Sequence, residues 1–251
     1  MKSIDLRQWL AWTFLLAAWG LSDSSAWATE AKVSAVPIRV VVDPGHGGKD
    51  AGARGPGGVQ EKELALTLAR ELREEARIMG GFQILLTREE DEMFSWARRR
   101  AASGNASLWL SIHLNADFDG RARGPRVFYL AGDGNGPPKE NARGSAPGGP
   151  SDVGAILQDM TRTKLGNESV LLAEHLQRGL EAAWGVGSRS SKPGPFLGLQ
   201  ELEIPAVVVE VGFITNQADQ RGLTDPNRRK QLAKAILRGV RSFVQDPRRE
   251  Q

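Results

Sequence analysis

Four polar side chains stand where apolar segments of this 251-residue chain begin or end, and together they could form a metal-dependent hydrolytic site. His46 and His113 each follow an apolar run, and Glu61 begins an amphipathic stretch. Glu210 lies inside a run of valines. Two histidines and one carboxylate make the three-ligand set of a hydrolytic zinc site, whose fourth position holds a water with a pKa of about 7. A second carboxylate could then serve as the base that takes a proton from that water.

Each of these side chains, taken alone, also has an ordinary structural interpretation. A histidine in a loop or at a strand end is often bonded to the backbone, and a carboxylate at a helix start often only complements the helix dipole. Glu210 is harder to explain in this way, because the valines around it would bury its charge, and a buried carboxylate needs a cation or a bonded partner. The recurrence of such groups at element ends favours one shared site.

The element that must position His46 is the apolar run 38–42, which ends in a turn rich in glycine. Three branched residues in a row are typical of a strand that is covered on both faces, and Pro44 with its neighbouring glycines stops the strand. A histidine just past the carboxyl end of a strand lies where open α/β sheets keep their sites. The spacing of glycine and lysine does not match a phosphate-binding loop.

The rest of the chain alternates between strand and helix periods, which predicts a parallel sheet with right-handed crossovers. We therefore expect an α/β fold: a single domain with a mostly parallel, twisted sheet of about six strands, flanked by helices on both faces. The expected strands are 38–42, 82–87, 108–113, 126–130 and 206–213, and the expected helices are 61–79, 93–103, 153–164, 170–184 and a last one that Asp225-Pro226 opens.

Composition limits the chemistry. The chain has no cysteine, so thiolate metal sites, disulfides and cysteine nucleophiles are excluded, and any metal must be held by His, Asp or Glu. Lys and Arg number 33 against 30 Asp and Glu, a formal net charge of +3. No basic stripe interleaved with aromatic residues accompanies this charge, and we expect no nucleic-acid partner.

Residues 1–28 have the features of a secretory signal peptide. Lys2 and Arg7 precede an apolar run, 9–21, that is too short to span a bilayer comfortably, and small residues follow at the two cleavage positions. The alternative is an uncleaved membrane anchor. Cleavage would leave a short leader at 29–37, no stable membrane span, and a protein exported to a bacterial periplasm.

The expected catalytic domain runs from 38 to 245 and contains one segment of different composition. Glycine and proline dominate 132–152, which predicts a flexible insertion that could be regulatory. Residues 246–251 are charged, and we expect a frayed tail. We find no internal repeat and no second domain.

The motifs around the four polar residues resemble those of the zinc-dependent N-acetylmuramoyl-L-alanine amidases, the Amidase_3 type of peptidoglycan amidase. The resemblance covers about 38–244. The motifs that carry it are Asp43–Gly52, Glu61-Lys62, Thr87-Arg88, Ser111–Ala116 and Ile204–Asn216.

This resemblance implies that His46, Glu61 and His113 hold one Zn²⁺ and that Glu210 is the catalytic carboxylate. The implied substrate is peptidoglycan, cut at the amide between the lactyl group of N-acetylmuramic acid and the L-alanine of the stem peptide. His175 matches no ligand motif, and we interpret it as structural or solvent-facing. We expect an acceptor on the far nitrogen of a metal-bound histidine, with Asp43 and Asn115 as unranked candidates.

The resemblance leaves several points open. The family has an arginine after its Thr-Arg turn, and any of Arg98, Arg99 and Arg100 could correspond to it. Some periplasmic members carry an inhibitory helix that covers the zinc until a LytM-domain activator moves it. Here the composition of 132–152 argues against one long helix, although 153–164 could form a short one.

Two other functions remain as alternatives. Another metallohydrolase on the same scaffold, such as a carboxypeptidase or sugar deacetylase, would share the ligands. A catalytically dead wall-binding protein would be expected to lack one of the four residues, and all four are present.

Overall fold

In the computed structural model, the described residues are 36–130, 150–187 and 190–250. Those from 37 onward belong to one compact unit. The expected signal peptide, the first seven residues of the expected leader and most of the expected insertion lie outside the described residues, so those predictions stay predictions.

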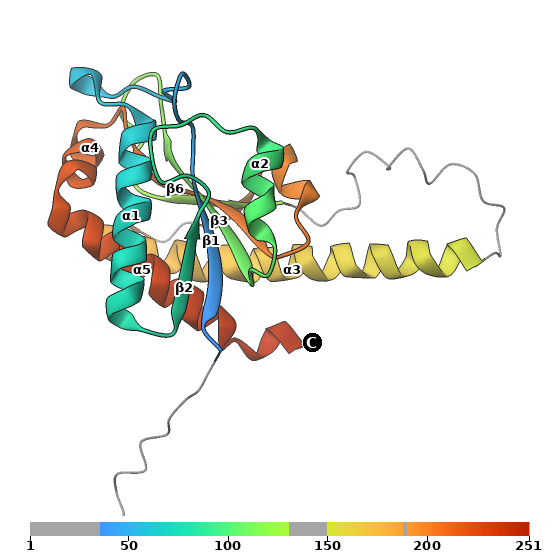
Figure 1. Cartoon of the computed structure of the whole chain (residues 1–251). Coiled ribbons are helices and arrows are strands. Elements are labelled where there is room, and N and C mark those ends of the chain that lie inside the picture. The colour runs from blue at the N-terminus through green and yellow to red at the C-terminus, as the bar shows by residue number, and fades with distance from the viewer. Residues whose placement is uncertain (1–35, 131–149, 188–189, 251) are drawn as a thin grey trace, which may run out of the picture. The chain divides into compact units, whose positions relative to one another are not determined.

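The centre of this unit is a six-stranded sheet (Figure 1). The strands lie in the order β2-β1-β3-β6-β4-β5. The first four of these are parallel to one another, whereas β4 pairs antiparallel with β6, and β5 pairs parallel with β4. The mostly parallel sheet is therefore confirmed. The strand bounds are β1 Ile38–Pro44, β2 Phe82–Leu86, β3 Leu108–Asn115, β4 Arg126–Tyr129, β5 Lys192–Pro193 and β6 Ala206–Phe213.

Helices cover both faces of the sheet, as the alternation of side chains along β1 illustrates. Val40 and Val42 pack in the larger core, which α1, α3 and α5 complete on one face. Val41 points to the other face and packs in a smaller cluster with α2. The helices are α1 Glu61–Met79, α2 Trp96–Arg100, α3 Pro150–Trp184, α4 Gln217–Thr224 and α5 Pro226–Val244, and 3₁₀ turns occupy Pro56–Gly58, Ala101–Ser103, Leu197–Glu201 and Pro247–Glu250.

The prediction of two helices between 153 and 184 was wrong, because α3 is continuous through this region. Gly166 and Asn167, which lie between the two predicted helices, are weak helix formers. Tertiary contacts outweigh that preference: the Ser169 hydroxyl donates to the Leu165 carbonyl and accepts a hydrogen bond from the Ala206 amide at the start of β6. The helix is thereby tied to the sheet just after the weak residues.

The first part of α3 extends beyond the body of the sheet (Figure 1). Residues 156–164 are exposed, including Ile156, Leu157 and Met160, which are each about 60% exposed. Burial begins at Ser169 and continues through the second half, where the helix packs against α5. Among the described residues, no helix is both long enough and apolar enough to cross a bilayer.

Two smaller differences lie near the C-terminus. Helix α4 was not predicted; the Asn216 side chain caps it by accepting hydrogen bonds from the amides of Ala218 and Asp219. The expectation of a frayed tail was wrong for 246–250. Asp246 is bonded to His175 on α3, and a 3₁₀ turn follows.

Candidate metal centre

Strands β3 and β6 place His113 and Glu210 side by side. The two residues are directly opposite in the parallel register, so their side chains leave the same face of the sheet. This is the face that α2 covers, because Trp109 and Val208, at even spacings before them, pack in the α2 cluster. Both polar side chains are half-buried and lie in the carboxyl-terminal halves of their strands.

The loop after β1 delivers His46 in an unusual backbone conformation. His46 has φ +60°, and it is the one non-glycine residue with positive φ among those the structure describes. This conformation costs an L-residue about 1–2 kcal/mol. The turn that follows closes through mutual backbone hydrogen bonds between Gly47 and Asp50, and the Asp50 carboxylate lies 2.8 Å from His46 Nδ1. The ring is therefore held with Nε2 facing away from Asp50.

Glu61, the first residue of α1, lies between the two histidines. Its Oε2 is 3.0 Å from His46 Nε2, and its Oε1 is 2.9 Å from His113 Nδ1. The same two oxygens accept backbone hydrogen bonds from Ala53 and Leu114. One ligand atom from each of the three predicted ligands lies within 4.8 Å of the others.

The electrostatics of this cluster favour a charged carboxylate. Burial alone would raise the pKa of Glu61, but the hydrogen bonds from His113, His46 and the two amides outweigh it and hold the pKa well below its usual range. The hydrogen bond with Glu61 is the largest cause of a raised pKa at His46, with Asp50 adding to it against the opposing effect of burial. Glu61 therefore keeps its negative charge despite its burial, and a charged carboxylate between two imidazoles suits a cation.

Two glycines leave the space that the ligand side chains occupy. A Cβ on Gly52 would lie 2.6 Å from both Glu61 Oε2 and His46 Cδ2, and a Cβ on Gly45 would lie 2.2 Å from His113 Cε1. The donor set of two imidazoles and one carboxylate is the one expected for catalytic zinc. The residues present therefore fit a zinc ion.

Glu210 lies beside this set in a different environment. Burial raises the pKa of Glu210 to about 7, although the charge of His113 and a hydrogen bond from Asn115 oppose the shift. The Asn115 side-chain amide donates to Oε2 of Glu210. A carboxylate whose pKa is near neutrality can both accept and return a proton at physiological pH.

The expected acceptors behind the histidines were wrong. His46 Nδ1 pairs with Asp50, whereas Asp43 pairs with Arg99 and Asn115 donates to Glu210. Asp50 stands four residues after His46 in the same turn, and this short spacing could have indicated it.

The structure also separates the residues that the sequence left unresolved. Arg99 is buried and bonds to the loop that carries His46, whereas Arg98 and Arg100 are exposed. His175 lies on α3 and pairs with Asp246, outside the ligand cluster, which agrees with a structural role.

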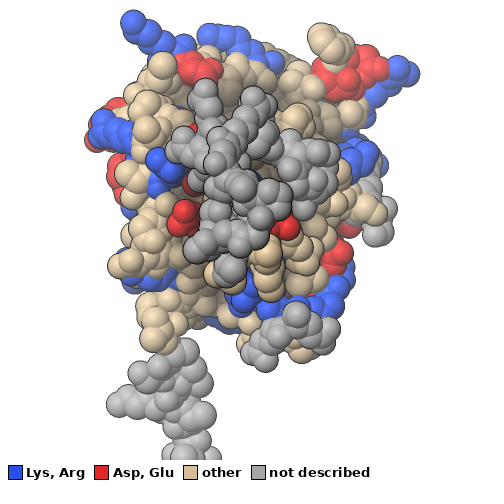
Figure 2. Space-filling model, turned by 90° about the vertical axis from the view of Figure 1, so that its right-hand side faces the viewer, with Lys and Arg blue, Asp and Glu red and all other residues tan. Residues whose placement is uncertain are grey.

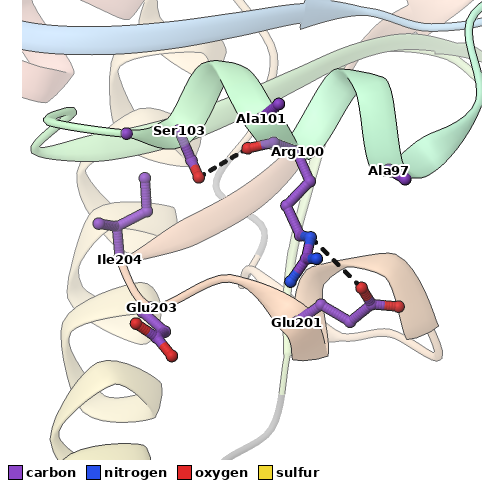
Figure 3. Close-up of a pocket in the computed structure, with 8 residues that line it drawn as sticks. Ala97, Arg100, Ala101, Ser103, Glu201, Glu203 and Ile204 are labelled. Carbon is purple, nitrogen blue, oxygen red and sulfur yellow. Dashed lines mark hydrogen bonds and ion pairs between the residues drawn. The ribbon is translucent and has the colours of Figure 1, made fainter.

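A separate groove of about 430 Å³ lies between α2 and the segment before β6 (Figure 3). Arg100 Nε is 3.5 Å from Glu201 Oε2 across it. The four predicted site residues are not among those that line it, so this groove is distinct from the metal centre.

On the face shown in Figure 2, basic and acidic side chains are interspersed.

The candidate metal site consists of a His-Glu-His set near the carboxyl edge of a mostly parallel sheet, and a second carboxylate lies opposite one of the histidines. This combination of fold and site is the one expected of an α/β metal-dependent hydrolase. Within that class, the chain belongs to the Amidase_3 family, described as N-acetylmuramoyl-L-alanine amidase, whose profile matches residues 40–242.

Individual relatives agree with this membership. The chain is 32% identical over 228 residues to N-acetylmuramoyl-L-alanine amidase AmiA of Escherichia coli, covering 85% of this chain and 78% of the relative. It is 31% identical over 219 residues to AmiC of Neisseria meningitidis, covering 82% of this chain and 52% of that protein. The chain thus spans about half the length of the Neisseria relative.

Solved structures confirm the fold. An N-acetylmuramoyl-L-alanine amidase from Clostridium difficile 630 matches with a TM-score of 0.65 and 25% identity, over 84% of this chain and 98% of that one. AmiC2 of Nostoc punctiforme matches with a TM-score of 0.63 and 26% identity, over 83% of this chain and 98% of that one.

Proposed function

We propose that this protein hydrolyses the amide between N-acetylmuramic acid and the L-alanine of the peptidoglycan stem peptide, with one zinc ion held by His46, Glu61 and His113. The observation that carries the proposal is the gathering of these three ligand atoms within 4.8 Å, with a second carboxylate, that of Glu210, on the residue opposite His113 in the sheet. Family membership over 40–242 supplies the substrate class.

When bound, the zinc would polarise the substrate carbonyl and lower the pKa of the attacking water. Glu210 takes a proton from that water and returns it to the leaving amine of L-alanine. The pKa of about 7 suits this double role, since the group then exchanges protons readily near neutrality. The Asn115 side-chain amide donates to Oε2 of Glu210 and so restricts the orientation of this carboxyl group.

We further propose that residues 1–28 direct export and are removed, so that the enzyme remodels the cell wall from the periplasm. The basic residues and short apolar run of this segment support the proposal. A role in daughter-cell separation and activation by a LytM-domain protein are finer parts of the same proposal. Both follow from the family resemblance, and a rate assay with and without such an activator tests the second.

The deciding experiment is digestion of purified sacculi by the zinc-loaded chain 29–251, followed by mass spectrometry. We expect free stem peptides that begin at L-alanine, with the sugar chains intact. Release of acetate would indicate a deacetylase, and loss of terminal residues from the stem would indicate a carboxypeptidase. Unchanged sacculi that retain the protein would indicate a binding protein and would contradict the proposal.

A further inference from the structure

The left-handed backbone of His46 requires an explanation, because a non-glycine residue keeps such a conformation only when its surroundings enforce it. The loop itself is rich in glycine and would relax easily. His46 is also one of the three proposed zinc ligands, so its backbone conformation decides where its ring points.

Two buried guanidinium groups bind the carbonyls of three successive residues, the last of β1 and the first two of the loop after it. Arg88 donates from Nε to the Pro44 carbonyl at 3.0 Å and from Nη2 to the Gly45 carbonyl at 2.9 Å. Arg99 donates from Nη1 to the Pro44 carbonyl at 2.9 Å and from Nη2 to the carbonyl of His46 itself. The carbonyl of the left-handed residue therefore has a fixed direction.

The position of Arg99 is itself fixed by a buried carboxylate. Its Nη1 lies 2.7 Å from Oδ1 of Asp43, the last residue but one of β1. Asp43 also accepts hydrogen bonds from Ser111 on β3 and from the Thr87 hydroxyl. The exposed fractions of Arg99 and Asp43 are 9% and 4%, so solvent hardly screens their charges.

We infer that Arg99 is a positioning residue for the metal centre: by holding the His46 carbonyl it keeps His46 in the left-handed conformation that directs Nε2 toward Glu61. This inference rests on the zinc site of the proposed function. Arg99 touches none of the proposed reacting atoms and acts through the loop backbone. A lysine at this position could not reach Asp43, Pro44 and His46 together, because a single ammonium lacks the planar fork of arginine.

The test compares zinc affinity in the mature chain with Arg99 and with Arg99→Lys, measured by competition with a chromophoric chelator. We expect the lysine variant to bind zinc at least about tenfold more weakly, the range found when groups behind metal ligands are removed. The metal-free variant should keep an unfolding temperature within a few degrees of the parent. Its cobalt-substituted form should also show a changed visible spectrum, because the ligand geometry differs.

Arg100→Lys is the matched control, since Arg100 is the next residue of α2 and is exposed. Its zinc affinity and cobalt spectrum should equal those of the parent. If Arg99→Lys does not fold, the zinc affinity of the double variant Arg99→Met, Asp43→Asn is measured instead. This variant leaves no unpaired buried charge, because it removes both charges of the pair together. Weaker zinc binding by that folded double variant would support the inference.

A folded Arg99→Lys with unchanged zinc affinity and an unchanged cobalt spectrum would overturn the inference, whether or not its stability fell. The test needs no substrate. A parent protein that binds zinc and leaves sacculi intact would therefore overturn the proposed amidase activity and leave this comparison standing.

Discussion

At the residue scale, burial brings the pKa of the Glu210 carboxyl group close to neutrality, which suits the proton transfer that we propose for it. In the metal-free protein its pKa is raised from 4.5 to about 7, chiefly by burial. Between these two pH values the folded protein holds a proton that the unfolded chain releases, so stability falls as pH rises through this window. Above pH 7, the free energy of unfolding is lowered by the full cost of burying the charged Glu210 carboxylate.

The first prediction follows from this sign. Metal-free Glu210→Gln should be more stable than the metal-free parent at pH 8, by up to about 3 kcal/mol, and the difference should vanish near pH 4.5. Glutamine still offers an oxygen to the Asn115 amide. Denaturant unfolding of both proteins across this pH range measures the effect, and a difference independent of pH would contradict it.

The second prediction separates the roles within the site. Glu210→Ala should abolish the release of stem peptides and still bind about one zinc per chain, whereas His46→Ala should lose both. The reason is that, in the proposed mechanism, Glu210 supplies the proton transfer, typically worth about two to four orders of magnitude, and does not bind the zinc. Metal analysis of dialysed protein beside the sacculus assay gives the answer, and equal zinc loss in the two variants would refute this division.

The sequence pointed to four residues that the structure brings together, His46, Glu61 and His113 in one cluster and Glu210 opposite His113, but it did not predict all of the groups that support them. His46, Glu61, His113 and Glu210 stood out because polar groups recurred at the ends of apolar elements. Asp50 was within reach of a spacing argument, but the contacts of Arg99 and Asn115 join segments far apart in the sequence, and no local spacing indicates them. Three consecutive arginines are equivalent in the sequence, and only burial against the loop distinguishes the middle one.

At the scale of elements, glycines in the loop between β1 and α1 leave room for the side chains of the proposed ligands. Gly52 and Gly57 both have positive φ, of +64° and +73°. A Cβ on Gly52 would meet Glu61 and His46, whereas a Cβ on Gly57 would meet nothing within 4 Å. A substitution by alanine at Gly57 therefore adds only backbone strain, whereas the same substitution at Gly52 adds both backbone strain and a steric clash with the ligand side chains.

The third prediction uses this pair. Gly57→Ala should cost about 1–2 kcal/mol of unfolding free energy and leave zinc affinity unchanged. Gly52→Ala should cost more and should also weaken zinc binding, because the added methyl displaces two ligand side chains. Calorimetry on the metal-free variants, together with zinc titration, makes the comparison; equal effects in the two variants would count against the proposed crowding.

Helix α3 provides the fourth prediction, since one substitution can be made in both of its halves. Leu157 is 59% exposed in the first half, and Leu176 is fully buried in the second. Leu157→Ala should change the unfolding free energy by less than about 0.5 kcal/mol, and Leu176→Ala should lower it by about 2–5 kcal/mol. Thermal unfolding distinguishes them, and a large cost at Leu157 would mean that the first half is packed in solution.

Most elements were predictable because their apolar periods are strong, as in β1, α1 and β6. The failures came from weak local signals that tertiary contacts override. In α3, the contacts of Ser169 carry the helix through a glycine, and α4 is too polar for its period to be seen. Its cap, Asn216, was the available signal.

For the whole molecule, we expect zinc binding and folding to be linked, because the three proposed ligands come from three different parts of the chain: the loop after β1, helix α1 and strand β3. The fifth prediction is that zinc at about 100 times its dissociation constant stabilises the folded chain by about 2.7 kcal/mol. For a unit of this size the unfolding temperature should rise by about 5–10 °C. A chelator should reverse the shift, and His46→Ala should show none; a shift of equal size in that variant would place the zinc elsewhere.

The place of β6 in the sheet also sets an order in time. β6 lies between β3 and β4, although it is synthesised after both. During synthesis, all three proposed zinc ligands are therefore made before Glu210. Strand β4 is also made before β6, the strand with which it pairs antiparallel. We expect the capacity to hold the proposed zinc ion to precede the capacity to use it, so that a chain still being synthesised would lack the proposed catalytic carboxylate.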